Sequence, residues 1–300
     1  MPEPTKPEPQ FDVIVCGSLH LDIMVHAPYL PRRDETAVGQ SWDQACGGKG
    51  GNQAVQAARL GARTAMIGRI GKDGFGERLI ANLDREGVDR TCVDVDPQAG
   101  SGMSVAIVDA DGDYGAVIVS DANLTIDPQI LGAIWHRLGG ARVLVLQNEV
   151  LHAVNVAAAR IARRTGATVL FNAAPARESG NDLLDLVDVL VVNRVEAEML
   201  SGVQVTDRSS AISALPALGA SRRTVIVTLG GDGLVVAPAD AAPCEIVAQR
   251  VAVVSTHGAG DCFVGALACR LAAGDDMIDA CRFANATAGA FVATDLGRTA

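Results

Sequence analysis

The feature that most constrains the fold is a repeated alternation between short apolar runs and longer segments with helical spacing. The predicted strands of this pattern are residues 11–17, 64–70, 142–146, 168–171, 187–192 and 224–229. The predicted helices are residues 52–60, 77–86, 153–164, 195–201, 210–219, 261–273 and 276–293. Strands that alternate with helices along a chain form a parallel sheet with helices on both faces. The sequence therefore predicts an α/β fold around a central, mostly parallel sheet.

Several apolar runs do not fit this alternation. They are residues 21–27, 104–108, 115–119, 233–237 and 245–251. The turn-rich sequence between the second and third predicts a β-hairpin, and the last two predict a late antiparallel addition to the main sheet. The segments around 18–45 and 100–121 are expected to form a small β-sheet. It would be either a lid over the carboxyl ends of the main strands or an edge through which two copies pair.

Composition indicates one folded unit with a substantial core. The hydrophobic fraction is 49% and the mean hydropathy is +0.23, which is typical of a globular chain. The Pro- and Glu-rich residues 1–10 predict a disordered tail, and no linker divides residues 11–300, which we expect to be a single domain. No apolar run approaches the ~18 residues of a membrane span. The seven cysteines are scattered without a CxxC pair, which is typical of reduced thiols in a cytoplasmic protein.

The charge balance excludes some classes of partner. Lys and Arg number 25 against 35 Asp and Glu, which gives a net charge of −10 and a pI near 4.9. A surface this acidic repels nucleic acids and anionic membranes, so neither is an expected partner. If the ligand carries phosphate, a metal ion or backbone N–H groups must offset the repulsion.

Ligands of an open parallel sheet bind outside the carboxyl ends of its strands, so polar residues after the predicted strands are candidate site residues. One such segment, residues 47–52 (Gly-Gly-Lys-Gly-Gly-Asn), opens a predicted helix. Glycines there let the backbone approach a ligand, and free N–H groups favour anions or hydroxyl oxygens. The spacing is not that of a P-loop or a dinucleotide fingerprint. A flexible turn with Asn52 as a helix cap explains the segment equally well.

A second segment, residues 255–261 (Ser-Thr-His-Gly-Ala-Gly-Asp), opens an Ala-rich predicted helix. Small residues at a helix start form an anion-binding cradle from backbone N–H groups. A carboxylate beside a bound phosphate can take the proton from an attacking hydroxyl, which is the general-base role in phosphoryl transfer. Asp261 is the candidate for this role. The alternative is that Asp261 only caps the helix.

Two further polar segments follow apolar runs. Asn193 and Glu196 lie at a predicted helix start, and oxygen ligands of this kind suit Mg²⁺, usually through water. A capping arrangement at the helix start is the competing explanation. Residues 228–233 (Thr-Leu-Gly-Gly-Asp-Gly) form a strand-to-turn segment whose glycines would let a nucleotide approach. No His/Cys cluster has zinc spacing, and no G-x-S-x-G elbow indicates a serine hydrolase.

Taken together and in this order, these segments resemble the ribokinase family of carbohydrate kinases, in the phosphofructokinase-B superfamily. The similarity extends from Val13 to about Gly297. The matching segments are CGSLHLD at 16–22, GGKGGNQAVQAARLGA at 47–62, GKDGFGE at 71–77, NAAPARE at 172–178, NRVEAEMLSG at 193–202 and THGAGDCFVGAL at 256–267. The resemblance implies a ribokinase-like fold whose β-lid often forms the contact of a homodimer. It implies a kinase that uses ATP and Mg²⁺ to phosphorylate a primary hydroxyl of a pentose, first of all D-ribose to ribose 5-phosphate.

The resemblance also assigns roles to individual residues. Asp261 matches the catalytic base, and the N–H groups of Gly258, Ala259 and Gly260 match the anion hole for the transferring phosphate. The matches to sugar-binding positions are His20, Asp22, Gly48, Lys49, Asn52, Glu149 and Asp261. The matches to nucleotide-binding positions are Asn193, Thr228, Gly230, Gly233, Gly260 and Asn285, and those to the metal-organising pair are Asn193 and Glu196.

Three features depart from the family pattern. His20 stands where ribokinases usually carry Asn beside the sugar, so recognition of the sugar hydroxyls is expected to differ. Ser255 stands where potassium-activated members carry Asp, and the loss of that carboxylate makes a K⁺ requirement doubtful. The sequence stops at Ala300, where family members usually continue with a loop and a last helix, so a truncated chain is one expectation.

Two alternative functions stay open. The same fold and chemistry would serve another substrate, such as a fructose-type sugar, a sugar acid or a nucleoside. A nucleoside kinase needs an apolar wall for the base, and the predicted lid offers Met24, Val25 and Met103 but few aromatic residues, which disfavours that substrate. The other alternative is a relative that binds sugar without turnover, and the intact segment 258–261 argues against it.

Overall fold

The larger of two sheets is built around β1 (Phe11–Cys16), a strand that is buried on both faces. The computed structural model describes residues 8–110, 113–177, 180–239 and 241–294. Successive side chains of a strand point to opposite sides. Ile14 and Cys16 accordingly belong to one hydrophobic core, whereas Val13 and Val15 belong to the other. A strand covered on both faces needs a continuous apolar run, which is why β1 shows no polar alternation.

The other strands of this sheet are β4 (Thr64–Gly71), β5 (Asp89–Asp96), β8 (Ala141–Gln147), β9 (Thr168–Asn172), β10 (Val189–Asn193), β11 (Thr224–Thr228), β12 (Leu234–Ala237) and β13 (Cys244–Ile246). Within the described residues the order is β13-β12-β11-β10-β9-β8-β1-β4-β5. All neighbours from β11 to β5 pair in parallel, whereas β12 pairs antiparallel with both β11 and β13. The predicted mostly parallel sheet and its late antiparallel addition are confirmed.

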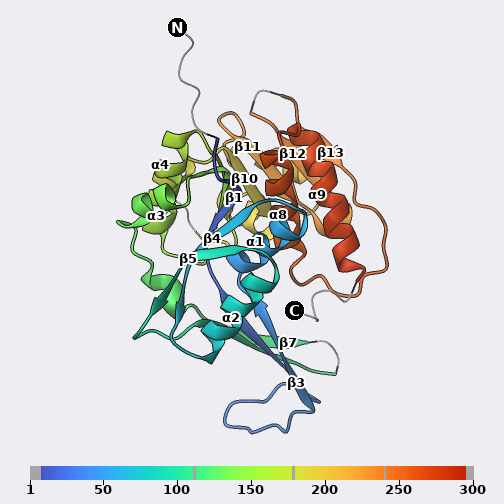
Figure 1. Cartoon of the computed structure of the whole chain (residues 1–300). Helices are drawn as coiled ribbons and strands as arrows, with labels where there is room; N and C mark the ends of the chain where they lie inside the picture. The colour runs from blue at the N-terminus through green and yellow to red at the C-terminus, as the bar shows by residue number, and fades with distance from the viewer. Residues whose placement is uncertain (1–7, 111–112, 178–179, 240, 295–300) are drawn as a thin grey trace.

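Helices cover both faces of this sheet, as predicted (Figure 1). One core is shared with α3 (Leu131–Arg137), α4 (His152–Thr165), α5 (Asn181–Leu184), α6 (Arg194–Ser201) and α7 (Arg208–Ala214). The other core is shared with α1 (Lys49–Arg59), α2 (Gly74–Arg85), α8 (Ala259–Ala272) and α9 (Met277–Val292).

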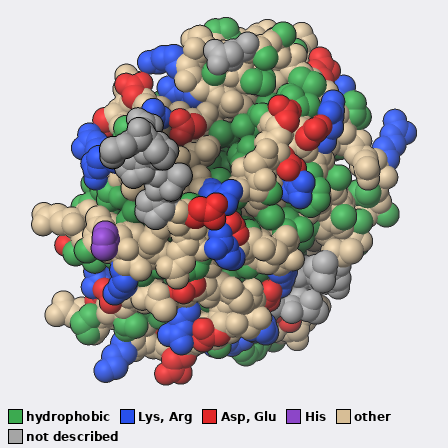
Figure 2. All heavy atoms as spheres, turned by 45° about the horizontal axis from the view of Figure 1, so that its top comes forward, with side chains coloured by type: hydrophobic (Ala, Val, Ile, Leu, Met, Phe, Trp, Pro, Cys, Tyr) green, Lys and Arg blue, Asp and Glu red, His purple; other side chains and the backbone are tan. Residues whose placement is uncertain are grey.

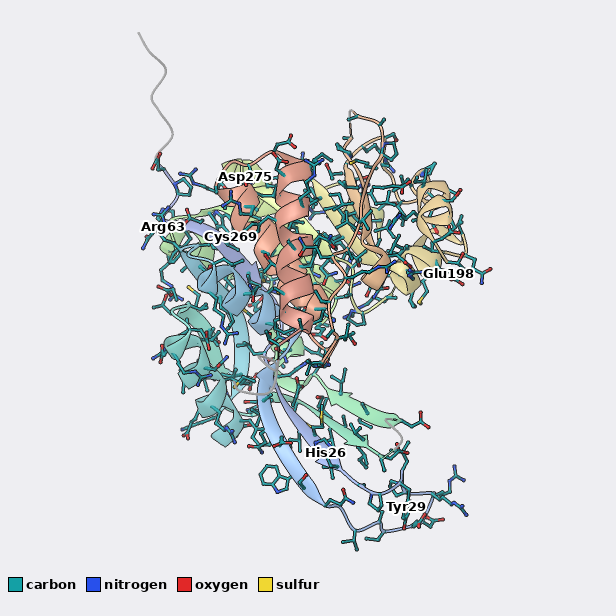
Figure 3. All side chains as sticks on the ribbon, turned by 90° about the vertical axis from the view of Figure 1, so that its right-hand side faces the viewer. His26, Tyr29, Arg63, Glu198, Cys269 and Asp275 are labelled. Carbon is teal, nitrogen blue, oxygen red and sulfur yellow. The ribbon has the colours of Figure 1, made fainter. Side chains whose placement is uncertain are left out.

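The small sheet projects from the edge of the larger sheet at which β1 ends (Figure 3). Its strands are β2 (His20–His26), β3 (Ser41–Gly47), β6 (Gly102–Val108) and β7 (Tyr114–Val119), in the order β3-β2-β6-β7. The central pair β2–β6 is parallel and both outer pairs are antiparallel, so the predicted 104–119 hairpin is confirmed. Only residues 17–19 separate β1 from β2, which keeps this sheet close to the carboxyl ends of the main strands. We call this small sheet the lid.

Some elements differ from the sequence prediction for physical reasons. The first helix begins at Lys49 rather than at residue 52, because Gly50 and Gly51 are helical despite their low propensity. A Cβ at Gly50 would lie 2.7 Å from the backbone of Ser18, so only glycine lets α1 pack this closely. The charged edge strand β5 and the short helices α3 and α5 were not predicted, because they have too few periodic apolar residues.

Charges of both signs are mixed on the face shown in Figure 2, where Lys and Arg lie among Asp and Glu. No helix of the described residues is long and apolar enough to cross a membrane. The predicted tail lies mostly outside the described residues, as do Glu178 and the C-terminal residues 295–300.

The contact between α1 and α8 is predicted to depend on Gly265. A Cβ there would lie 2.7 Å from both the carbonyl oxygen of Gln53 and Cβ of Gln56, so the two helices would have to separate. Gly265→Ala should lower the free energy of unfolding in urea by about 1–3 kcal/mol. Gly289 of α9 is the matched control, because a Cβ there meets nothing within 4 Å. Gly289→Ala should be neutral or stabilising by up to about 1 kcal/mol, and equal losses in both variants would contradict the prediction.

Candidate active site

Five of the predicted site residues lie close together at the carboxyl edge of the larger sheet, beside the lid. The Lys49 ammonium lies within electrostatic range of carboxylates from four separate parts of the chain, and these carboxylates raise its pKa. They are Asp22 of β2, Glu149 after β8, Glu196 of α6 and Asp261 of α8. Parallel strands all end at the same edge of their sheet, which is why segments distant in sequence converge here.

Asp261 lies in the first turn of α8 and is only 8% exposed. Its Oδ1 accepts a hydrogen bond from Nε2 of Gln53 at 2.9 Å, and its Oδ2 accepts one from Nδ2 of Asn52 at 3.2 Å. The N-cap of α8 is Gly258, and none of the side chains that the structure describes caps this helix. The explanation of Asp261 as a helix cap is therefore wrong, because its carboxylate binds side chains of α1 instead.

Burial raises the pKa of the Asp261 carboxyl above its ordinary value. The Lys49 ammonium and the hydrogen bonds from Gln53 and Asn52 act in the opposite direction without cancelling the effect. A carboxylate with a raised pKa binds a proton more readily than an exposed one. That is the property a general base needs, so the environment of Asp261 suits proton transfer.

Lys49 owes its position to a glycine at the start of α1. Gly48 has a φ of +82°, and a Cβ there would lie 2.7 Å from the backbone nitrogen of His20. Burial lowers the pKa of the Lys49 ammonium, but the surrounding carboxylates outweigh burial and the net direction is upward. Lys49 therefore stays charged and offsets the negative charge of the site.

Glu149 connects the loop after β8 to the turn between β1 and β2. Its Oε2 accepts hydrogen bonds from Oγ of Ser18 at 2.5 Å and from the backbone N–H of Lys49 at 2.9 Å. The same oxygen lies 4.0 Å from Nδ1 of His20. His20 is 3% exposed, and its Nε2 has no hydrogen-bond partner among the described residues. A buried polar atom without a partner is uncommon in folded proteins.

Asp22 is held on the lid side of the site. Its Oδ1 accepts a hydrogen bond from Oγ of Ser104 at 2.5 Å, and its Oδ2 would lie 2.0 Å from a Cβ at Gly47. The glycine on β3 therefore makes room for this carboxylate. Asp22, Asn52 and Gly258 all line one cleft of about 510 Å³ between the lid, α1 and the start of α8.

Asn193 and Glu196 form a capping box at the start of α6. Oδ1 of Asn193 accepts from the N–H of Glu196 at 2.9 Å, and Oε2 of Glu196 accepts from the N–H of Asn193 at 2.8 Å. The capping explanation is thus confirmed, and it leaves the second carboxylate oxygen of Glu196 outside these bonds. Burial raises the pKa of the Glu196 carboxyl, whereas the Asn193 N–H and the Lys49 ammonium lower it to a smaller extent.

The segment 228–233 leaves β11, turns through η2 (Gly230–Asp232) and enters β12. Gly230 and Gly233 have φ values of +60° and +90°, and a Cβ at Gly233 would lie 2.0 Å from the carbonyl oxygen of Ile246. Thr228 at the end of β11 donates from Oγ1 to the Val192 carbonyl at 3.4 Å. The turn therefore needs its glycines, and it lies at the same edge of the sheet as Asn193.

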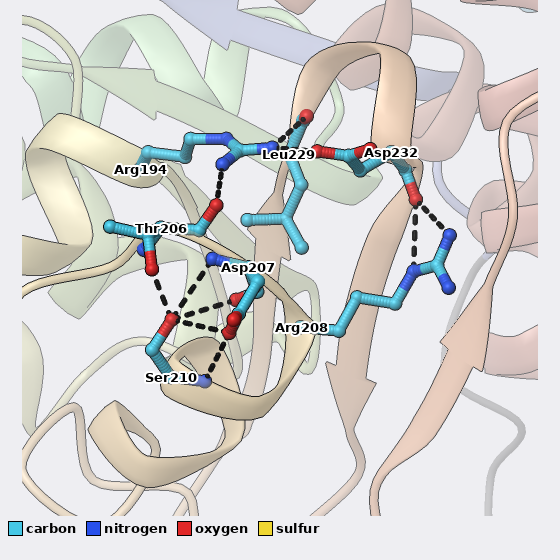
Figure 4. Close-up of polar contacts among 7 residues, drawn as sticks. All are labelled: Arg194, Thr206, Asp207, Arg208, Ser210, Leu229 and Asp232. Atoms are coloured by element: carbon cyan, nitrogen blue, oxygen red, sulfur yellow. Dashed lines mark hydrogen bonds and ion pairs between the residues drawn. The ribbon is translucent and has the colours of Figure 1, made fainter.

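Two arginines hold this turn from outside (Figure 4). Arg194 donates from Nη2 to the Leu229 carbonyl at 2.9 Å, and it also pairs with the Asp232 carboxylate and the Thr206 carbonyl. Arg208 donates from Nε and Nη2 to the Asp232 carbonyl at 3.0 and 2.7 Å. Sequence reasoning missed both arginines, because partly exposed charged residues carry no spacing signal.

The remaining predicted residues lie at the start of α8 and on α9. Gly258 has a φ of +78°, and the N–H of Ala259 donates to the Thr256 carbonyl at 3.2 Å. The Ala259 N–H would have to give up its hydrogen bond to Thr256 before it could donate one to a phosphate. Asn285 of α9 donates from Nδ2 to the Val247 carbonyl at 3.0 Å, which ties α9 to the segment after β13.

Gln53 is the buried side chain that sequence reasoning overlooked, although its neighbour Asn52 was singled out. It is fully buried and hydrogen-bonded to Asp261. The available signal was its place on α1, in line with the buried residues Gly50, Ala54 and Ala57. A polar amide on an otherwise apolar stripe of a helix needs an internal partner.

Comparisons with known proteins identify the family of this chain. The family described as pfkB family carbohydrate kinase matches residues 10–299. The ribokinase of Mus musculus is 36% identical over 276 residues, which cover 90% of this chain and 85% of that protein. The ribokinase of Haemophilus influenzae is 34% identical over 275 residues, which cover 91% of this chain and 90% of that protein.

A solved structure supports the same assignment. The structure of Arabidopsis thaliana ribokinase complexed with ribose and ATP matches with a TM-score of 0.87 and 29% sequence identity. The match covers 95% of this chain and 93% of that one, so the predicted ribokinase-like fold is confirmed. Because the family match spans nearly the whole sequence and relatives above 30% identity cover about nine-tenths of it, this chain belongs to the pfkB family of carbohydrate kinases.

Proposed function

We propose that this sugar kinase transfers the γ-phosphate of ATP to the primary hydroxyl of D-ribose and releases ribose 5-phosphate. The observation that carries the proposal is the buried carboxylate of Asp261, which lies in the first turn of α8 beside Asn52 and within electrostatic range of Lys49. The relatives named ribokinase, and the related structure solved with ribose and ATP, support this choice of the two substrates.

Asp261 is the proposed general base. It accepts the hydroxyl proton as the sugar oxygen bonds to the γ-phosphorus, and the bond from that phosphorus to the bridging oxygen of ADP breaks. Phosphoryl transfer depends mainly on positioning and charge stabilisation, so one base and a few N–H donors suffice. The N–H groups of Gly258, Ala259 and Gly260, at the N-terminus of α8, are the proposed anion hole.

The sugar is proposed to bind between the lid and the start of α1. Asp22 and Asn52 line the cleft and would accept and donate hydrogen bonds to sugar hydroxyls. Gly48 lets the backbone approach, and the Lys49 ammonium would donate to hydroxyl oxygens. Glu149 supports the loop that carries Lys49, through its bond to that residue's backbone N–H.

The nucleotide is proposed to bind along the turn 228–233, with Thr228, Gly230 and Gly233 as contacts and Asn285 on the neighbouring helix. Mg²⁺ would lie near Asn193 and Glu196. In the capping box, Oδ1 of Asn193 and Oε2 of Glu196 already accept hydrogen bonds, whereas the other Glu196 carboxylate oxygen lies outside these bonds. These residues therefore fit an ion that is held through water molecules. When bound, the ion would neutralise charge on the phosphates of ATP. The N–H groups at the start of α8 would stabilise the charge on the γ-phosphoryl group that is transferred.

Another sugar is the second candidate substrate, and His20 is the observation that favours it. Its buried Nε2 lacks a protein partner among the described residues, so a substrate hydroxyl is the expected partner. Family members usually carry Asn here, and an imidazole places its donor farther from the backbone than an Asn amide does. A substrate with a differently placed hydroxyl would therefore fit.

The lid is the proposed contact between two copies of the chain. Val117, Ile118 and Val119 of the outer strand β7 are 67%, 58% and 44% exposed. Successive residues of a strand face opposite sides, so both faces of this edge are apolar. Burial of such an edge against a second lid would remove apolar surface from water. Light scattering should therefore give twice the chain mass, and a monomer at micromolar concentration would contradict the dimer.

A reducing compartment, the cytoplasm, is the proposed location, because the structure contains seven free cysteines and five of them are buried.

We also propose that K⁺ stimulates the enzyme weakly, since Ser255 offers a hydroxyl where potassium-activated members carry a carboxylate. Turnover compared in equal concentrations of NaCl and KCl tests the second proposal. A large rise in kcat in KCl would contradict it.

The function is tested by measuring ADP release from Mg·ATP with D-ribose, 2-deoxyribose, fructose, a sugar acid and adenosine. D-ribose should show the highest kcat/KM. Preference for another compound would be consistent with the same kinase mechanism, and it would show that His20 and the lid recognise a substrate other than D-ribose. Absence of turnover with every compound would contradict the proposed function.

Replacement of the base is predicted to remove turnover without removing sugar binding. Asp261→Asn keeps an oxygen acceptor for Gln53 but cannot take the hydroxyl proton, so kcat should fall by roughly 100-fold or more. The Kd for ribose, measured by calorimetry, should change by less than about threefold. Asp185→Asn, at an exposed ion pair with Arg222, is the matched control. Comparable kcat in Asp261→Asn and the control would exclude the proposed role.

Loosening the turn 228–233 is predicted to weaken ATP binding selectively. Arg208→Ala removes both hydrogen bonds to the Asp232 carbonyl, so the KM for ATP should rise by roughly three- to tenfold while the KM for ribose stays constant. Arg222→Ala, which removes an exposed arginine paired with Asp185, is the matched control. A rise in both KM values, or no rise in either, would show that this turn does not serve the nucleotide.

A further inference from the structure

Gln53 connects Asp261 to two strands of the larger sheet. Its Nε2 donates to Oδ1 of Asp261 at 2.9 Å and to Oδ1 of Asn172, at the end of β9, at 3.1 Å. Its Oε1 accepts from Nε2 of Gln147, at the end of β8, at 2.8 Å. Nδ2 of Asn172 continues the chain by donating to the Val191 carbonyl of β10 at 3.3 Å. All atoms of the Gln53 amide group that can form hydrogen bonds are thus used.

These bonds leave the Gln53 amide a single orientation. An ionised carboxylate only accepts hydrogen bonds, so the nitrogen of Gln53 must face Asp261 and its oxygen must face Gln147. Gln53 and Gln147 are both fully buried, at 0% exposure, so water cannot replace either contact. A buried, fully bonded amide of this kind holds its neighbours in one arrangement.

The two carboxylate oxygens of Asp261 have different surroundings. Oδ1 is bound to Gln53, which is buried and does not line the cleft. Oδ2 is bound to Nδ2 of Asn52 at the longer distance of 3.2 Å, and Asn52 does line the cleft. Asp261 itself does not line the cleft, so the Asn52 amide lies between Oδ2 and that space. A hydroxyl that enters from the cleft would reach Oδ2 by replacing this amide.

We propose that Gln53 is a positioning residue, which anchors Oδ1 of Asp261 so that Oδ2 receives the proton of the sugar hydroxyl. The inference rests on the proposed role of Asp261 as the base. Gln53 does not line the cleft, so it would touch neither substrate. It acts by fixing the rotation of the Asp261 carboxylate relative to Gln147 at the end of β8 and Asn172 at the end of β9.

The hydrogen bond from Gln53 also affects the pKa of the Asp261 carboxyl. An N–H that donates to a carboxylate stabilises its ionised form, so loss of the Gln53 amide should make Asp261 bind its proton more tightly. The titratable Cys262 thiol is next to Asp261 on α8, and three charged groups of the described residues act on Asp261 electrostatically: Lys49 of α1, Glu149 after β8 and Glu196 of α6. All three remain when Gln53 is replaced, so a change in the pH dependence of turnover can be assigned to the lost amide.

Gln53→Met tests the proposal, because methionine keeps the length of the side chain but has no N–H. We expect kcat to fall by roughly tenfold or more, with the KM for ribose changed less than about threefold. The acidic limb of the kcat–pH profile should move to higher pH by roughly half a unit or more. Both are measured by ADP release on the full chain.

The matched control is Asn155→Leu. Asn155 is also fully buried, and its Nδ2 donates to the backbone carbonyl of Gln147 at 2.7 Å without touching Asp261. This variant should lose thermal stability to a similar degree, yet keep the pH profile of the unmodified chain. A purely structural role for Gln53 would make the two variants alike in kcat and in pH profile, which would overturn the proposal.

Two further variants make the test decisive. If Gln53→Met does not fold, Gln53→Glu keeps the shape of glutamine and places a second carboxylate beside Asp261. Repulsion between the two should move the acidic limb still farther to higher pH, and an unmoved limb would overturn the proposal. Asp261→Asn, assayed in parallel, tests the role of Asp261 as the base separately from the positioning role of Gln53. An active Asp261→Asn would overturn the base assignment itself, whereas an inactive one with an unshifted Gln53→Met profile would overturn only the positioning role.

Discussion

The structure of the site depends on the close packing of α1 against α8. Gly265 lets α8 approach the backbone of α1, and Gly50 lets α1 approach the turn after β1. This packing buries Asp261 and places it within hydrogen-bond distance of Asn52 and Gln53. The lid follows directly from the same turn, so the contact that positions Asp261 also positions the lid wall of the cleft.

Charge compensation is the second constraint, because a chain of net charge −10 gathers four carboxylates around its site. Burial of an unpaired charge is costly, and Lys49 offsets it together with N–H donors. Backbone N–H groups engage Glu149 and Glu196, while side-chain amides engage Asp261. The same solution serves a phosphate ligand, since helix N-termini provide positive potential without adding basic side chains.

Much of the fold could be predicted from the sequence, because strands buried on both faces must be continuous apolar runs. The predictions at 11–17 and 142–146 fall within one residue of β1 and β8 at each end. Helix starts were less predictable where glycine was involved, as at Lys49, since local propensity disfavours the helix and only the neighbouring backbone explains it. The edge strand β5 has a charged sequence, DRTCVDVD, and only its pairing with β4 identifies it as a strand.

The sequence by itself determined the residue types at the ends of the strands and the glycines that precede α1 and α8, because these depend on local backbone geometry. It therefore indicated Asp261, Lys49 and Asn193 as candidates. Only the tertiary structure decided what each side chain touches. It showed that Asp261 does not cap its helix, that Asn193 and Glu196 do form a capping box, and that Gln53 donates a hydrogen bond to Asp261. Such contacts join residues up to 209 positions apart in the chain, and no local pattern records which distant partner a buried polar group will find.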